Sequence, residues 1–351
     1  MDVSAFYKNT TKKEFLYQKK KCQERGKRAA DYKKRPLPNP QQLPGCFAPR
    51  KVWKWFPLQQ EAFEYQKKCF DKSLRVFGFE KLNAKRKFLV ANYRTFWSRY
   101  KNMEASRRRF YEIIKPESPC RLHFDIEYQK LLNPHLDGNS CVDTFVKYVC
   151  HCLHVDFGIQ CTKKDVIDLE SSCSKKFSRH LIFHLKDALF VNNLACGNFV
   201  KAICHSLRAY LTTGICNHYV TLALFGSGQL ADKNLRTLLI NTEDGKAAFL
   251  CDLAIYSKNR NFRLYLSQKM SKQVPLTIAN ENKFVFKSHL SLKESNMYKM
   301  WNEHYNKEYQ LFLDCLVCEE RMAWDDRDVQ LLKYGGEETP VLDEFQDEGM
   351  W

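Results

Sequence analysis

The chain has 351 residues, of which 44% are hydrophobic, including 25 Phe, 17 Tyr and 6 Trp. This composition is globular and excludes an intrinsically disordered chain, and the length suffices for two or three compact units. The formal net charge is +17. Such a surplus favours a polyanionic partner, although mitochondrial and ribosomal proteins can be as basic. No run of about 18 apolar residues occurs, so we expect no membrane span.

The cysteines and the first residues bear on the compartment and on zinc. The N-terminal sequence MDVSAFYKNTTKKE lacks the apolar core of a secretory signal, and the chain has 15 cysteines. Together these features indicate a reducing compartment with free thiols. Cys315 and Cys318 form a CxxC pair without a second pair downstream, and Cys150 and Cys152 lie in an apolar helical pattern. We therefore expect core packing there and no structural zinc.

The N-terminal fifty residues and the C-terminal end differ in charge. Residues 1–50 are expected to form a basic helix over 10–35, followed by a proline-rich linker. This segment is either a solvated tail or an arm that contacts nucleic acid. Residues 331–351 are expected to be an acidic, disordered tail, because the last fifteen residues hold six acids and no bases.

The region 52–115 mixes predicted helices and strands. LQQEAFEYQKKCF and YRTFWSRYKNM have helical patterns, whereas SLRVFGFE and RKFLVANY have strand patterns. Over 120–266 the pattern predicts a strand in CRLHFDIEYQ, a helix at 141–157, a strand in KFSRHLIFHL, a helix at 197–211, a hairpin and a strand in NRNFRLYL. This order predicts an α+β fold with helices on one face of the sheet, like an RNA-recognition fold.

Two acids alternate on the first strand of that region. Asp125 and Glu127 project to the same face, with Cα atoms about 6–7 Å apart. Neighbouring carboxylates repel unless a cation lies between them, and hard oxygen ligands suit Mg²⁺ or Mn²⁺. The alternative is an exposed strand face with two solvated acids.

The next strand offers donors for phosphate oxygens. Lys176, Ser178 and His180 share one face of KFSRHLIFHL, the opposite face from Arg179. A cation, a hydroxyl and an imidazole in a row suit phosphate binding. The alternative is an ordinary polar strand face with a surface histidine.

A third carboxylate and further cations follow in the chain. Asp252 stands in an apolar run, where an unpaired carboxylate is costly, so a metal ion or an arginine partner is expected. The cluster of nearby polar groups comprises Arg260, Asn261, Arg263 and Lys269. Three carboxylates with two basic clusters match the inventory for phosphoryl transfer by two metal ions.

The segments CRLHFDIEY, SSCSKKFSRHLIFHL and DLAIYSKNRNFRLYLSQK resemble three signature blocks of the eukaryotic primase-polymerases, in the archaeo-eukaryotic primase superfamily. The resemblance covers about residues 50–330. It implies a two-module core with an N-terminal helix. The expected parts are residues 1–50, an N-terminal α/β module at 51–117 completed by part of 208–234, a catalytic RNA-recognition-like module at 118–330, and the tail 331–351.

The resemblance also implies roles for the residues above. Asp125, Glu127 and Asp252 would be the catalytic, metal-binding carboxylates, for Mn²⁺ or Mg²⁺. The remaining polar residues would bind the incoming nucleotide: Arg86, Lys176, Ser178, His180, Arg260, Asn261, Arg263 and Lys269.

The same resemblance implies a monomer that extends DNA from nucleoside triphosphates on single-stranded or primed templates. It implies work in damage tolerance, translesion synthesis and replication restart, in the nucleus and also in mitochondria. A single-strand DNA-binding protein is an expected partner of the acidic tail. Members of the family carry a zinc module after the core that supports primer initiation, so its absence here puts de novo priming in doubt but not extension.

Two functions of other classes stay open at this point. A metal-dependent nuclease would use the same carboxylates, but it has no need of a triphosphate pocket. A non-catalytic nucleic-acid-binding module would share the basic, aromatic-rich composition, but it has no need of Asp125, Glu127 and Asp252. DNA cleavage without nucleotides would favour the first, and salt-sensitive binding without incorporation the second.

Overall fold

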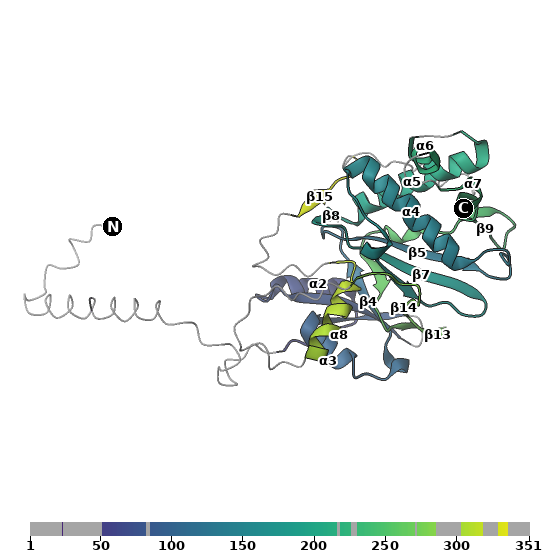
Figure 1. Cartoon of the computed structure of the whole chain (residues 1–351). Coiled ribbons are helices and arrows are strands. Elements are labelled where there is room, and N and C mark those ends of the chain that lie inside the picture. Colours follow the sequence, from purple (N-terminus) through teal and green to yellow (C-terminus); the bar gives the residue numbers. More distant parts are fainter. Residues whose placement is uncertain are drawn as a thin grey trace, which may run out of the picture. The chain divides into compact units, whose positions relative to one another are not determined.

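The structure of the chain, a computed structural model, describes residues 51–81, 85–215, 218–225, 230–270, 272–285, 303–318 and 329–335, together with Gln23 (Figure 1). The chain divides into two compact units, Met1–Lys51 and Val52–Trp351. The expected basic helix and proline-rich linker of residues 1–50 lie outside the described residues, apart from Gln23, which is helical and exposed.

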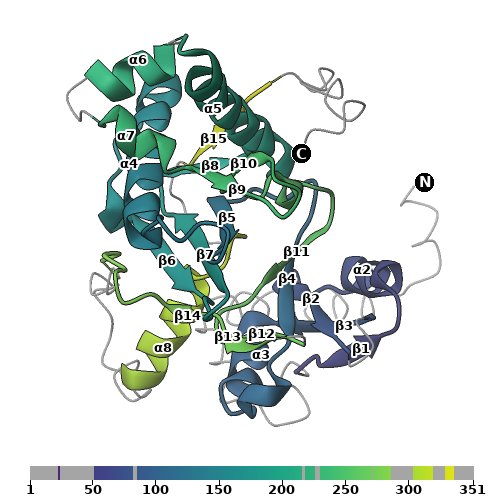
Figure 2. The same ribbon diagram turned by 90° about the vertical axis from the view of Figure 1, so that its right-hand side faces the viewer.

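A five-stranded antiparallel sheet forms the first part of the second unit (Figure 2). Its strands, in order, are β1 (Lys54–Phe56), β3 (Arg86–Asn92), β2 (Leu74–Glu80), β4 (Phe110–Ile114) and β11 (Arg260–Arg263). Side chains alternate between two cores. Val76 and Val90 pack with α2 (Gln59–Lys68), while Phe77 and Leu89 pack in a core with α3 (Tyr93–Tyr100) and α8 (Glu303–Asp314).

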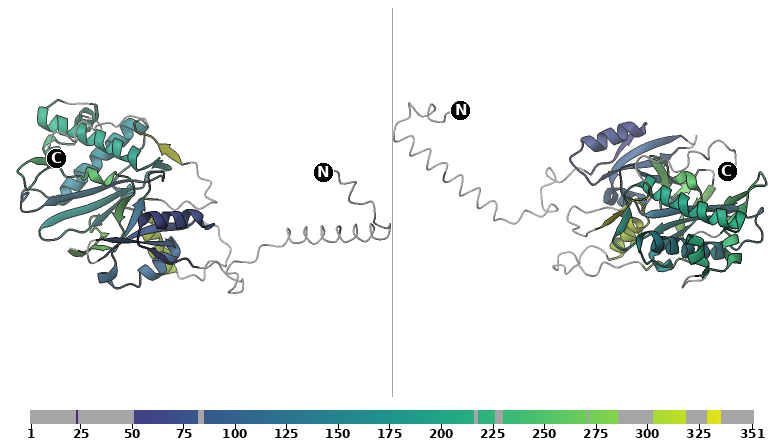
Figure 3. Two further views of the ribbon diagram at one scale, coloured as in Figure 1. Left: turned by 180° about the vertical axis from the view of Figure 1, so that it is seen from behind. Right: turned by 90° about the horizontal axis from the view of Figure 1, so that it is seen from above.

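A four-stranded antiparallel sheet forms the second part, with the order β14 (Thr277–Ile278), β6 (Val166–Glu170), β7 (Lys176–Phe183) and β5 (Leu122–Gln129). Four helices lie together on one side of it, as Figure 3 shows from two further directions. They are α4 (Gly138–Phe157), α5 (Asn193–Thr213), α6 (His218–Phe225) and α7 (Asp232–Arg236). Leu122, Phe124 and Ile126 of β5 are fully buried in this core. The α+β fold expected from the sequence is confirmed.

The remaining elements are short. Strands pair as β9 (Leu239–Asn241) with β10 (Ala247–Phe249), β12 (Gln268–Lys269) with β13 (Lys272–Pro275), and β8 (Ala188–Phe190) with β15 (Gln330–Leu332). The 3₁₀ turns are η2 (Ala105–Arg107), η3 (Lys163–Asp165) and η4 (Leu253–Ile255). None of the helices in the described part has the length and apolar character that a bilayer span requires.

Local sequence explains where the two long helices begin and end. The Asp137 side chain accepts a hydrogen bond from the Ser140 N–H at the start of α4, and Asn192 caps α5 in the same way. Gly158 and Gly214 end these helices with positive φ angles of 67° and 73°. A residue with a Cβ is strained in that conformation, so glycine suits both positions.

Three segments bear on the expected boundaries. Buried residues of 208–234, such as Tyr210 and Leu230, pack in the core that contains the second sheet. The first sheet also includes β11, whose residues lie within the expected range 118–330, because β11 pairs with β4. Residues 330–332 pair in parallel with β8, so the folded part extends past residue 331. The rest of the expected tail, from residue 336, lies outside the described residues.

Candidate active site

The antiparallel pairing of β5 with β7 brings the two predicted polar faces together. Asp125 lies opposite His180, and Glu127 lies opposite Ser178. The apolar face packs on the helices, as expected from the alternation. The polar face is only partly exposed, because the side chains of Asp125 and Glu127 are 14% and 33% exposed. The ring centroids of Phe262, on β11, and His180 lie 4.4 Å apart, and His180 is only 3% exposed.

An isolated β-bridge next to Asp252 brings this residue beside β5. Cys251 pairs with Ile126, and the Asp252 N–H donates to the carbonyl oxygen of Asp125 at 2.9 Å. The Asp252 carboxylate caps η4 by accepting from the Ala254 N–H at 2.8 Å. Its other oxygen lies 3.8 Å from Nη2 of Arg260. An arginine partner was one of the two explanations that the sequence left open for this carboxylate.

Cations surround the carboxylates without neutralising all of them. Lys176 forms an ion pair with Glu127. Arg263 is buried, and its Nη2 donates at 2.6 Å to the hydroxyl of Ser171, whose Oγ in turn lies 3.2 Å from Oγ of Ser178. Arg263 therefore donates this hydrogen bond to a hydroxyl and not to a carboxylate. The charges of Asp125 and Glu127 act on its guanidinium group, which does not form an ion pair with either of them.

The electrostatics of Asp125 follow from this arrangement. Burial raises the pKa of its carboxyl to about 6, the neighbouring charge of Glu127 adds to the rise, and Lys269 opposes it. Its Oδ1 is buried without a hydrogen-bond partner and lies 3.7 Å from Nε2 of His180. Burial, together with Arg263 and Lys269, holds the pKa of His180 well below its usual value. The imidazole is therefore neutral and supplies no positive charge to Asp125.

The nucleotide-binding cations predicted from the same region are also affected by burial. Burial lowers the pKa of Lys269, and Arg263 lowers it further, while Asp125 and Glu127 oppose the fall. The guanidinium of Arg86 lies 5.4 Å from the ring of Tyr111, a residue that pairs with Arg263 across β4 and β11. Arg86 thus contacts the residue that lies opposite Arg263 in the neighbouring strand.

Asn261 lies close to the first sheet. A Cβ atom on Gly78 would lie 2.3 Å from Oδ1 of Asn261, so a larger residue at position 78 would displace the Asn261 side chain. Oδ1 of Asn261 is buried without a hydrogen-bond partner, whereas its Nδ2 lies 3.4 Å from the carbonyl oxygen of Asn259.

A divalent cation fits the carboxylates chemically. The unpartnered oxygen of Asp125 has no hydrogen-bond donor, and burial favours a bound cation over an isolated charge. The acids are not drawn together around one point, however. Glu127 pairs with Lys176 and Asp252 with Arg260. Among the described residues, the three potential ligands that lie within 4.8 Å of one another are a different group: Cys120, His123 and Cys196.

Sequence reasoning missed several residues that shape the site. Ser171 connects Arg263 to Ser178, and Phe262 covers His180. Both come from segments whose position depends on tertiary pairing, and only the strand pattern of NRNFRLYL hinted at Phe262. Arg179, predicted on the apolar face of β7, lies there with acidic partners, Asp168 at 3.5 Å and Glu281 at 3.2 Å.

Comparisons with known proteins give one consistent result. No family model matches the chain. Curated proteins named DNA-directed primase/polymerase protein are similar to it. The protein of Mus musculus is 32% identical over 316 residues, covering 83% of this chain and 58% of the relative. That of Danio rerio is 34% identical over 269 residues, covering 74% and 51%. That of Homo sapiens is 31% identical over 339 residues, covering 84% and 58%. The chain thus spans little more than half the length of these relatives.

Proposed function

Since the chain belongs to the family of DNA-directed primase/polymerase proteins, we propose that it is a nucleotidyltransferase that adds nucleotides to a DNA strand. The observation that carries the proposal is the register of β5 against β7, with Asp252 bridged to β5. Three carboxylates, a lysine, a hydroxyl and a neutral imidazole thus lie on or beside one partly buried strand face. A polymerase needs carboxylates that bind metal ions and hydrogen-bond donors that bind the triphosphate.

Asp125, Glu127 and Asp252 would hold Mn²⁺ or Mg²⁺. When bound, the ions would activate the primer 3′-hydroxyl and offset the charge on the leaving pyrophosphate. Asp125 would contribute the buried oxygen that lacks a donor. Glu127 would exchange its ion pair with Lys176 for a metal ion. That exchange would release the ammonium group of Lys176 toward phosphate.

The donors on β7 and β11 would hold the triphosphate. The Ser178 hydroxyl and an N–H of the neutral His180 can each donate to a phosphate oxygen. Arg263 is fixed by Ser171, so its guanidinium is oriented before nucleotide binds. The other groups proposed to bind nucleotide are Arg86, Arg260, Asn261 and Lys269.

The wider setting is proposed on the family relationship and the charge. The partners would be single-stranded or primed DNA and nucleoside or deoxynucleoside triphosphates, which the net charge of +17 suits. We propose a monomer that works in damage tolerance, translesion synthesis and replication restart, in the nucleus and also in mitochondria. A single-strand DNA-binding protein would be its partner at the acidic C-terminal segment.

The test is incorporation of labelled dNTPs with Mn²⁺ on a primed and an unprimed single-stranded template. A double variant, Asp125→Ala with Glu127→Ala, removes the proposed metal ligands. The matched control is Glu61→Ala with Glu117→Ala, two exposed acids outside the site. Extension by the wild type and the control, but not by the site variant, is expected.

Other outcomes separate the alternative functions. Metal-dependent cleavage of the DNA without added nucleotides, lost in the site variant, would replace the proposal with a nuclease. DNA binding without extension or cleavage would replace it with a binding module. Products on the unprimed template as well would extend the proposal from extension to priming.

A further inference from the structure

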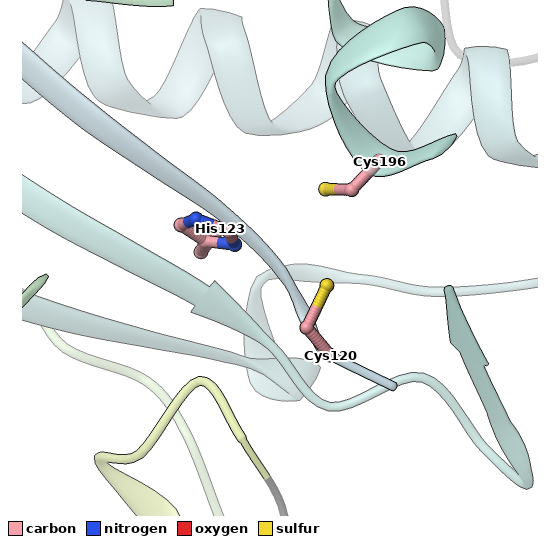
Figure 4. A group of neighbouring side chains, drawn as sticks. All are labelled: Cys120, His123 and Cys196. Atoms are coloured by element: carbon pink, nitrogen blue, oxygen red, sulfur yellow. The ribbon is translucent and has the colours of Figure 1, made fainter. Parts of the chain in front are cut away.

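Two thiols and an imidazole converge at the beginning of β5. Cys120 lies just before the strand and bridges to Phe190 of β8, His123 lies in the strand, and Cys196 lies in the first turn of α5. The possible ligand atoms of the three side chains all lie within 4.8 Å of one another. Figure 4 shows both sulfur atoms and the imidazole facing a common space. Each of the three residues is 0% exposed.

The imidazole of His123 is arranged as metal-binding histidines are. Its Nδ1 lies 3.0 Å from the carbonyl oxygen of Arg121, while its Nε2 is buried without a hydrogen-bond partner. Histidines that bind metal ions usually donate one ring N–H to a carbonyl and use the other nitrogen as the ligand. A buried polar atom without a partner is costly. A metal ion that accepts the lone pair of Nε2 would remove that cost.

The donor set selects the class of ion. Thiolate sulfur and imidazole nitrogen suit Zn²⁺, whereas Mg²⁺ and Mn²⁺ prefer oxygen. Ligands at about 2.0–2.3 Å from a tetrahedral zinc ion lie about 3.5–3.8 Å apart, so a small contraction of the observed group suffices.

We propose that Cys120, His123 and Cys196 form a Zn²⁺ site that is separate from the divalent ions of the candidate active site. The three side chains supply three ligands and leave one position of a tetrahedral ion open. The ion would join the first residues of β5 to the first turn of α5. Because His123 lies two residues before Asp125 on the same strand, the ion would hold the strand that carries the proposed catalytic carboxylates.

The first experiment measures metal content in the purified full chain. We expect about one zinc ion per chain by mass spectrometry of the elements. Replacement by Co²⁺ should give visible bands of a tetrahedral site and a near-ultraviolet sulfur-to-cobalt band. Zinc at about 100 times its dissociation constant should raise the ratio of folded to unfolded protein about 100-fold. A wild-type chain with no zinc and no cobalt band would overturn the proposal.

Variants locate the ion. Cys120→Ala and Cys196→Ala should each lose the zinc and weaken the cobalt band, while Cys152→Ala, which removes an equally buried thiol from α4, should keep both. The variant Asp125→Asn with Glu127→Gln should also keep both, because its carboxylates are not ligands of this ion. A band unchanged in Cys120→Ala and Cys196→Ala would place the metal elsewhere and overturn the assignment.

A measurement on the wild type alone tests the site even if the variants fail to fold. Zinc should protect Cys120 and Cys196 from alkylation, as read from peptide masses, and a chelator should remove the protection. Equal alkylation with and without zinc would contradict the site. A disulfide between Cys120 and Cys196 in protein purified without reductant, at the expense of zinc, would replace the metal site with a redox pair.

Discussion

Each face of β7 has an aspartate beside a nitrogen base, but only one of those bases is charged. On the helix-covered face, Oδ1 of Asp168 lies 3.5 Å from Nη1 of Arg179, whose Nη2 also reaches Glu170 at 3.4 Å. On the opposite face, Oδ1 of Asp125 lies 3.7 Å from Nε2 of His180. The two distances between carboxylate and nitrogen base are similar, but the charges of the two bases differ.

The difference lies in what can neutralise each acid. Arginine stays protonated in proteins, so Asp168 has a permanent partner. Burial still raises the pKa of Asp168 to about 6, with Arg179 opposing the rise. Asp125 has a pKa of about 6 as well, but its neighbour His180 is uncharged. One face is thus an internally paired ion cluster, while on the other face Asp125 lies beside a neutral imidazole.

Removing Arg179 should give the largest loss of stability. Arg179→Met would leave Asp168, Glu170 and Glu281 without their shared cation, and breaking a buried pair from one side costs about 3–5 kcal/mol. Urea unfolding at pH 7 measures the loss, with the exposed Lys147→Met as the control. A loss below about 1 kcal/mol would mean that the cluster is solvated in solution.

Changing Asp125 should instead affect activity. Asp125→Asn should lower the rate of nucleotide incorporation by about 10²–10³-fold, the effect typical of a lost electrostatic group in an active site. Asp168→Asn, assayed at a temperature where circular dichroism shows it folded, should keep most of the wild-type rate. Equal losses in both variants would remove the functional distinction between the two faces.

The pH dependence of stability sharpens the comparison further. The carboxyl pKa of Asp125 rises from 3.8 to about 6 on folding. The folded state therefore holds more protons between these values, and the unfolding free energy contributed by Asp125 falls as pH rises from 4 to 6.

With chelator present, the unfolding free energy of Asp125→Asn should exceed that of the wild type by up to about 3 kcal/mol above pH 6. Below pH 4 the two unfolding free energies should be equal. Saturating Mn²⁺ should abolish that gain by stabilising the wild type, while leaving the pH dependence of Asp168→Asn unchanged. Denaturant titrations at a series of pH values give both curves. A flat difference across pH would contradict the buried, proton-binding state of Asp125.

The smallest effect is expected from the ring over His180. Phe262→Leu removes the contact at 4.4 Å, worth about 0.5–1.5 kcal/mol, so KM for the nucleotide should rise about 2–10-fold with a smaller change in kcat. Phe284→Leu removes a similar ring from His184, at 4.7 Å, outside the candidate site. Steady-state kinetics should leave this control unchanged. A similar rise in KM in both variants would assign the effect to general loosening.

Local alternation predicted most of the candidate site, because the period of a strand fixes which side chains share a face. It placed Asp125 with Glu127, and Lys176 with Ser178 and His180, and the register of β5 with β7 joins the two sets. The core residues of β5 followed from the same pattern. The helices at 141–157 and 197–211 correspond to α4 and α5.

What the sequence left hidden depends on pairing between distant segments. Cys120 and Cys196 are separated by 76 positions, so no ligand spacing could reveal their approach to His123. The acids around Arg179 come from β6 and from the loop after β14. The segment 208–234 was hard to place from the sequence because its apolar side chains do not specify which of two neighbouring cores they fill.

The pairing of β11 with β4 has a consequence for incomplete chains. β11 closes the free edge of the first sheet, yet it lies about 150 residues beyond β4 in the sequence. A polypeptide interrupted before Arg260 would present the unpaired N–H and C=O groups of β4, flanked by the buried apolar surface of Phe110 and Ile114. Such an edge is a template for pairing with other chains. Truncated products should therefore aggregate, and nascent chains would need that edge shielded until β11 leaves the ribosome.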